Sequence, residues 1–102
     1  MKAIRAIAAS LLVFCWIGSA GAETIKIGVV LPYSGPMSDL GSQVDKAFDL
    51  YVKLHAEDLG DNKIELIKRD EGPPSGANAR TVVTELITKD KVKLVTGFVF
   101  SP

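Results

Sequence analysis

Residues 25–41 read IKIGVVLPYSGPMSDLG, and this stretch decides the fold class. In its first seven residues, apolar and polar side chains alternate at the start and the run then becomes continuously apolar. This pattern is typical of a strand buried on both faces of a parallel sheet. The loop at 32–39 holds two prolines and one glycine, so it cannot continue the strand. Ser38 or Asp39 is the expected N-cap of the helix that follows.

Beyond this loop the apolar residues recur with a helical period from residue 40 to about 56. The expected buried stripe consists of Val44, Ala47, Phe48, Tyr51 and His55. The side chains expected to point away from it are Asp45, Lys46, Asp49 and Lys53. The sequence thus predicts an amphipathic helix directly after the first strand.

The rest of the chain repeats this alternation. We expect a strand at 64–70, a breaker-rich loop at 71–76, a helix at 77–90 and a strand from 92 to about 100. The second helix carries its own apolar stripe of Ala79, Val82, Val83, Leu86 and Ile87. The order β-α-β-α-β predicts an α/β fold with a parallel sheet and right-handed crossovers.

The N-terminal residues 1–22 have the pattern of a secretory signal peptide. Lys2 and Arg5 precede the apolar run AIAASLLVFCWI, and Ala20-Gly21-Ala22 gives a small-x-small cleavage site. The run falls well short of the roughly 20 residues that span a bilayer. Cys15 follows the bulky Phe14, which argues against a lipoprotein signal. We therefore expect export to the periplasm and a mature chain of residues 23–102.

Composition excludes several classes of function. The chain has 12 basic and 12 acidic residues, and two of the basic ones lie in the leader, so the mature part is slightly acidic. This balance argues against nucleic acid and anionic lipid as partners. The single cysteine lies in the leader and His55 is the only histidine, so neither a disulfide framework nor a metal site is expected. No dinucleotide or P-loop motif is present, and no cofactor is predicted.

A ligand site is expected where the strand order reverses, beyond the carboxyl ends of the strands. If the second and third strands flank the first, this crevice lies between the first and third strands. Ser101-Pro102 fits the start of a helix whose free N–H groups, with the Ser101 hydroxyl, would bind an anion. The alternative is that Ser101 only caps its own helix. Tyr33, Phe98 and Phe100 are aromatic residues near this crevice, available for a pocket or for the core.

Asp70 and Glu71 are adjacent carboxylates at the end of the second strand. Such a pair could serve acid–base chemistry. A solvated turn or a helix-capping role is the favoured interpretation, because adjacent side chains at a strand end point to opposite sides.

The stretch IKIGVVLPYSGPMSDLG resembles the opening of periplasmic amino-acid-binding proteins of the leucine/isoleucine/valine type, the type I solute-binding components of ABC transporters. An IKIG strand followed by P-x-SGP and a helix opening with glycine is the motif that carries the resemblance. The later KIEL strand, the Pro-containing loop and the strand ending in Gly97 follow in the same order. The resemblance covers essentially all of residues 23–102.

The resemblance implies a protein of two lobes that closes on a ligand in the cleft between them, a closure that a membrane permease reads. By this likeness Ser101 holds the ligand carboxylate, and Leu40 takes the position of a ligand contact before Gly41. Phe100 stands where a smaller residue is usual. Leu40 and Phe100, with Tyr33, suggest an apolar pocket for an aromatic or other hydrophobic acid.

By the same likeness, residues 23–102 form part of the first lobe of a truncated type I fold. The expected function is delivery of an amino acid or related carboxylate to an ABC permease by a monomeric, non-enzymatic protein. One alternative is the ligand-sensing ectodomain of a receptor built on the same lobe. Another is an exported α/β hydrolase, for which this segment has no placed nucleophile and base.

Overall fold

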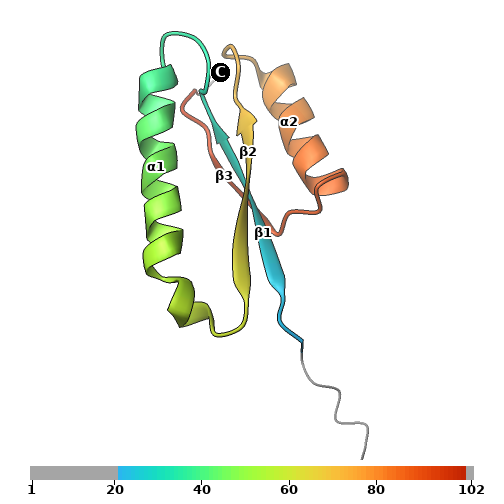
Figure 1. Ribbon diagram of the computed structural model, residues 1–102. Coiled ribbons are helices and arrows are strands. Elements are labelled where there is room, and N and C mark those ends of the chain that lie inside the picture. The colour runs from blue at the N-terminus through green and yellow to red at the C-terminus, as the bar shows by residue number, and fades with distance from the viewer. Residues whose placement is uncertain (1–20, 101–102) are drawn as a thin grey trace, which may run out of the picture.

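The computed structural model describes residues 21–100. Three strands and two helices alternate along the chain, as Figure 1 shows. Their bounds are β1 Thr24–Leu31, α1 Ser38–Leu54, β2 Lys63–Asp70, α2 Gly76–Thr88 and β3 Leu94–Gly97, with a short 3-10 helix η1 at Ala56–Leu59 after α1. Most of the predicted leader and the Ser101-Pro102 helix start lie outside the described residues.

The sheet is parallel, and its strand order is β2-β1-β3. Thr24 pairs with Lys63 at the start of β2, and Ile27 pairs with Leu94 at the start of β3. In Figure 1, α1 and α2 lie on opposite sides of this sheet. The predicted α/β class and the predicted parallel β-α-β-α-β topology are both confirmed.

The core centres on the carboxyl half of β1. Val29, Val30 and Leu31 are buried, as predicted for a central strand covered on both faces. From α2, Leu86 is fully buried and lies over Gly28, where a Cβ would come within 2.9 Å of a Leu86 methyl. Gly28 therefore lets α2 approach the sheet closely.

Helix α1 differs from its prediction at its start and in its buried face. The expected cap at Ser38 or Asp39 is wrong, because both residues lie within the first turn and the N-cap is Met37, without a side-chain hydrogen bond. The turn before the helix is closed instead by the Ser38 N–H, which donates to the Gly35 carbonyl at 3.1 Å.

The predicted α1 stripe is buried only in part. Tyr51 is 63% exposed, whereas Asp45, expected to point away, is half-buried and forms an ion pair at 3.0 Å with Lys68 of β2. The same ammonium group binds Asp49 at 2.8 Å. One polar edge of α1 thus faces Lys68 of β2, and part of the predicted apolar stripe is exposed to solvent.

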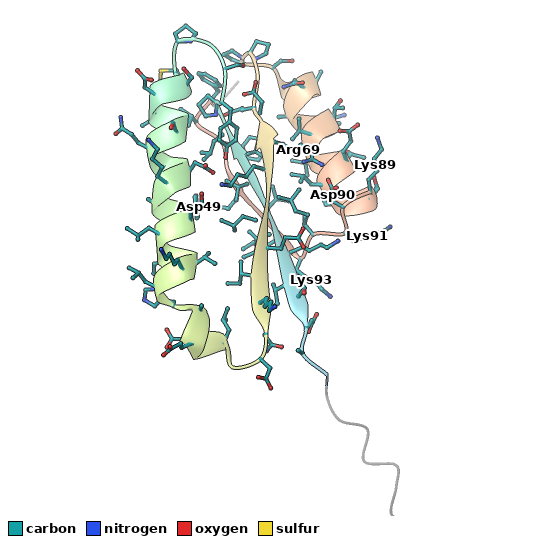
Figure 2. The ribbon with its side chains drawn as sticks, viewed as in Figure 1. Asp49, Arg69, Lys89, Asp90, Lys91 and Lys93 are labelled. Carbon is teal, nitrogen blue, oxygen red and sulfur yellow. The ribbon has the colours of Figure 1, made fainter. Side chains whose placement is uncertain are left out.

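The second helix follows its prediction closely. Ser75 is the N-cap, and its hydroxyl accepts a hydrogen bond from the Asn78 N–H. Of the predicted stripe Leu86 is buried, while Ile87 is 52% exposed. At the helix end Asp90 forms an ion pair with Arg69 of β2 at 2.7 Å, and both residues are labelled in Figure 2.

Strand β3 is shorter than predicted at both ends. Gly97 and Phe98 both have positive φ, at 114° and 66°, so the chain leaves the extended conformation there. A Cβ on Gly97 would lie 2.0 Å from the Val30 carbonyl oxygen, which explains why glycine occupies this position. Within residues 21–100, no helix has the length and apolar character needed to cross a membrane.

Candidate functional site

The observed strand order places the topological switch point between β1 and β3. The β1–α1 loop and the segment after β3 therefore meet at the carboxyl edge of the sheet, where open α/β sheets bind their ligands. Figure 1 shows these loops together at one end of the molecule, with the last described residues beside them. The predicted strand order, with the second and third strands on either side of the first, is confirmed, and the ligand site at this edge stays a prediction.

Asp70, at the end of β2, organises the β1–α1 loop. Its carboxylate accepts hydrogen bonds from the Tyr33 N–H at 2.9 Å, from the Gly72 N–H at 3.2 Å and from the Ser34 hydroxyl. The Ser34 bond is the largest of the effects that lower the pKa of Asp70 from its ordinary value, and the backbone donors add to it. Asp70 is thus an ionised anchor for the β1–α1 loop at the carboxyl edge of the sheet.

The Tyr33 side chain is bound to α1. Its hydroxyl donates to Asp45 at 2.7 Å, and the residue is half-buried. Burial first, and then the hydrogen bond and charge of Asp45, raise the pKa of Tyr33 well above its usual range. The hydroxyl is therefore already satisfied within the protein, and the contact of Tyr33 with a ligand stays a prediction.

Leu40 lies in the first turn of α1 and its side chain is 40% exposed. The next residue, Gly41, is buried against the loop, where a Cβ would come within 2.1 Å of the Pro32 carbonyl oxygen. The glycine lets the first turn of α1 pack directly on the end of β1. This contact fixes the position of Leu40 relative to the loop.

The segment after β3 is held by Glu71. This side chain is only 5% exposed, and its carboxylate accepts hydrogen bonds from the Val99 N–H at 2.8 Å and from the Phe100 N–H at 2.9 Å. One residue earlier, the Phe98 N–H donates to the Val30 carbonyl at 2.7 Å. The interpretation of Glu71 as part of a solvated turn or as a helix cap is wrong, because its partners lie beyond β3.

The four predicted ligand residues lie in different parts of the chain, and the structure describes three of them. Leu40 and Tyr33 lie on the β1–α1 side, and half-buried Phe100 lies on the β3 side. Ser101 lies outside the described residues. Sequence reasoning singled out Glu71 but missed its role, because its partners lie 28 and 29 residues away. The signal for it in the sequence was a carboxylate directly after a strand.

Other candidate chemistry is weak in the described part of the chain. Residues 21–100 hold no group of three or more side chains suited to a metal ion. His55 stacks on Tyr51, with ring centroids 3.9 Å apart, and its Nδ1 lies 2.9 Å from the Tyr51 carbonyl oxygen. A concavity of about 490 Å³ is lined in part by Val52, Leu59 and Ile64, at the opposite end of β2 from the crevice.

The fold defines a class: an α/β unit with helices on both faces of a parallel sheet and a topological switch point between its first and third strands. Residues 24–102 match the family model described as periplasmic binding protein, and the chain belongs to this family. The Leu/Ile/Val-binding protein homolog 6 of Brucella abortus is 34% identical over 94 residues. That alignment covers 91% of this chain and 24% of the relative, so the chain spans about a quarter of its length.

Solved structures give the same result. A solute-binding protein of an ABC transporter from Rhodopseudomonas palustris, in complex with 4-hydroxybenzoate, is 35% identical with a TM-score of 0.72, over 78% of this chain and 22% of that one. A second, from strain BisB5 and in complex with 3,4-dihydroxybenzoic acid, is 36% identical with a TM-score of 0.65, over 74% and 20%. These relatives are binding proteins, and the resemblance read from the sequence is confirmed.

Proposed function

We propose that the chain forms the first part of lobe one of an ABC-importer solute-binding protein that captures a small aromatic carboxylate. The observation that carries the proposal is the family match over residues 24–102 combined with the strand order, which puts the β1–α1 loop and the end of β3 at one ligand edge. Closure of a second lobe over this edge would signal the bound state to a membrane permease. The protein acts by binding, as a monomer and without a cofactor.

An aromatic acid is favoured over an aliphatic amino acid for two reasons. The structural neighbours hold 4-hydroxybenzoate and 3,4-dihydroxybenzoic acid at 35% and 36% identity. In this chain, Tyr33 and Leu40 lie between the end of β1 and the first turn of α1 and Phe100 follows β3, so apolar and aromatic side chains would be available to a ring at this edge. Ser101 would hold the carboxylate, with the free N–H groups of the helix expected to begin there.

Residues 1–22 are proposed to direct export and to be removed before residue 23. The leader pattern and the membership in a family of periplasmic binding proteins support a periplasmic location. Mass spectrometry of the exported protein should give an N-terminus at Glu23. Retention of residues 1–22 in the periplasmic fraction would contradict the cleavage.

The test is a thermal-shift titration of the whole binding protein that includes residues 23–102. The panel is 4-hydroxybenzoate, 3,4-dihydroxybenzoate, leucine and, as an uncharged control, 4-hydroxybenzamide. A specific ligand at 100 times its Kd should add about 2.7 kcal/mol to the free energy of unfolding. We expect this from the benzoates and not from the amide. Stabilisation by leucine alone would identify an amino acid, and not an aromatic acid, as the ligand. If no compound stabilises the protein, the proposal is rejected.

Ser101→Ala tests the assigned carboxylate contact. Loss of a hydrogen bond to a charged group should weaken benzoate binding by about 1–3 kcal/mol, measured by isothermal titration calorimetry. Thr84→Ala, on the exposed side of α2, is the matched control and should leave Kd unchanged. An unchanged Kd for Ser101→Ala would mean that this serine only caps its own helix.

A further inference from the structure

Glu71 is the buried charged residue of the described core, with 5% of its surface exposed. A carboxylate removed from water is costly unless charged hydrogen bonds replace its solvation. None of the ion pairs within residues 21–100 involves it. Its two oxygens are instead each satisfied by one backbone N–H, those of Val99 and Phe100.

The segment that Glu71 binds has few other attachments. β3 ends at Gly97, and Phe98 occupies the left-handed region, which is unfavourable for a residue with a bulky side chain. The Phe98 N–H still reaches the Val30 carbonyl, but Val99 and Phe100 lie beyond the strand pairing. The carboxylate therefore supplies the hydrogen bonds that the sheet no longer provides.

Glu71 is itself held rigidly. Its backbone N–H donates to the Leu31 carbonyl at 2.8 Å, and its carbonyl accepts a hydrogen bond from the side-chain amide of Asn78 in α2. The Asn78 N–H in turn donates to the Ser75 cap. The carboxylate thus connects the end of β1 and the start of α2 to the segment after β3.

Two consecutive backbone N–H groups can bind an anion together. Here the N–H groups of Val99 and Phe100 bind the carboxylate of Glu71. The amides of Val99 and Phe100 are therefore not available to a ligand. Their orientation is fixed immediately before Ser101, which is next in the sequence.

We propose that Glu71 is a positioning residue for ligand capture: by binding the Val99 and Phe100 amides it holds the segment after β3, with the predicted contact residue Phe100, in place at the ligand edge. The inference rests on the proposed function and adds to it the residue that preorganises this segment. Preorganised contacts bind more tightly because less ordering is required on binding.

The test compares Glu71→Gln with wild type in the whole binding protein, using 4-hydroxybenzoate as the probe. Glutamine keeps the shape but turns an NH₂ group towards one of the two backbone donors. Hydrogen exchange at Val99 and Phe100 should become faster, and Kd should rise at least about tenfold as preorganisation is lost. Glu85→Gln, which alters an exposed carboxylate of α2, should change neither quantity.

A second variant separates positioning from stability. Leu86→Ala opens the core on the α2 side and should lower Tm, while the folded molecules keep a Kd within about twofold of wild type. If Glu71→Gln leaves Kd within twofold, whatever its Tm or exchange rates, the inference is overturned and the proposed function stands, because wild type binds. If wild type itself does not bind the benzoate, the proposed function fails and the inference fails with it.

Discussion

Ser34 and Asp70 show how a single side-chain contact shapes the ligand edge. Asp70 is on the surface, yet it accepts three hydrogen bonds from the loop after β1 and from Gly72. Each donor favours the ionised form, so the folded protein holds this carboxylate as an anion at lower pH than an unfolded chain would. The conformation of the loop is therefore coupled to the charge of one residue.

Ser34→Ala should raise the pKa of Asp70 towards its ordinary value of 3.8, because the hydroxyl is the largest cause of the lowered pKa. The measurement is an NMR titration of the Asp70 side-chain carbonyl carbon. Ser42→Ala, on α1, serves as the control and should leave the titration unchanged. A pKa that stays at the wild-type value in Ser34→Ala would show that the backbone donors alone hold the anion.

The capped start of α2 is the clearest case at the scale of an element. Ser75 is extended, with φ −159° and ψ 121°, and its hydroxyl accepts the Asn78 N–H. The same Asn78 donates its side-chain amide to the Glu71 carbonyl. The cap thus supports both the helix and the backbone of the buried carboxylate.

Ser75→Ala should lower the free energy of unfolding by about 1 kcal/mol, the usual cost of a lost N-cap. Urea unfolding followed by circular dichroism measures the change. Ser75→Asp, which keeps an acceptor at the helix start, should recover most of the loss, whereas Thr81→Ala, exposed within the helix, should cost little. Equal stability of Ser75→Ala and wild type would show that this hydrogen bond contributes nothing.

The sequence predicted the elements well because each carries a local period. The predicted bounds of β1 and α2 lie within about two residues of the observed ones. An apolar run and a helical stripe depend only on neighbours in the chain, so the sequence reveals them. The inward turn of Asp45 on α1 could not be predicted, because it depends on Lys68 of another strand. The end of β3 was missed because the apolar run continues through Phe98, whereas the structure ends the strand at Gly97 and gives Phe98 a positive φ.

The candidate site was predictable only in outline. Strand order and the P-x-SGP motif pointed to the ligand edge, residue patterns pointed to Ser101, Tyr33 and Phe100, and family likeness added Leu40 and gave Ser101 the role of carboxylate contact. The role of Glu71 could not be found, because its backbone partners belong to a loop 28 and 29 residues later. Such a pairing leaves no trace in composition or period.

At the scale of the whole molecule, the pKa shifts of three groups predict how the free energy of unfolding depends on pH. It should be nearly constant between an acid limit and an alkaline limit. The lowered pKa of Asp70 contributes stability above about 3.8 that is lost as pH falls further. The raised pKa of Tyr33 contributes stability that is fully present below 10.0 and lost as pH rises above it. Lys68, whose pKa is raised mainly by its hydrogen bond to Asp49, contributes in the same direction as Tyr33.

The urea midpoint should therefore be nearly constant between about pH 5 and 9 and fall on both sides of that range. Tyr33→Phe removes the phenol, so the urea midpoint should fall less steeply with pH on the alkaline side than it does in wild type. On the acid side the midpoint should change with pH as in wild type. The measurement is a series of urea titrations across pH. An alkaline side as steep in Tyr33→Phe as in wild type would assign the loss to other groups.

The central place of β1 has a consequence for the order in which the chain can fold. β1 is the first element in the sequence, but both of its neighbours in the sheet come much later, at Lys63–Asp70 and Leu94–Gly97. No hairpin can form early, so the first apolar strand must wait for two distant segments before its backbone is paired. The sheet can therefore begin to pair only once residues 63–70 have been made, and this order would suit the export before folding that we propose for residues 1–22.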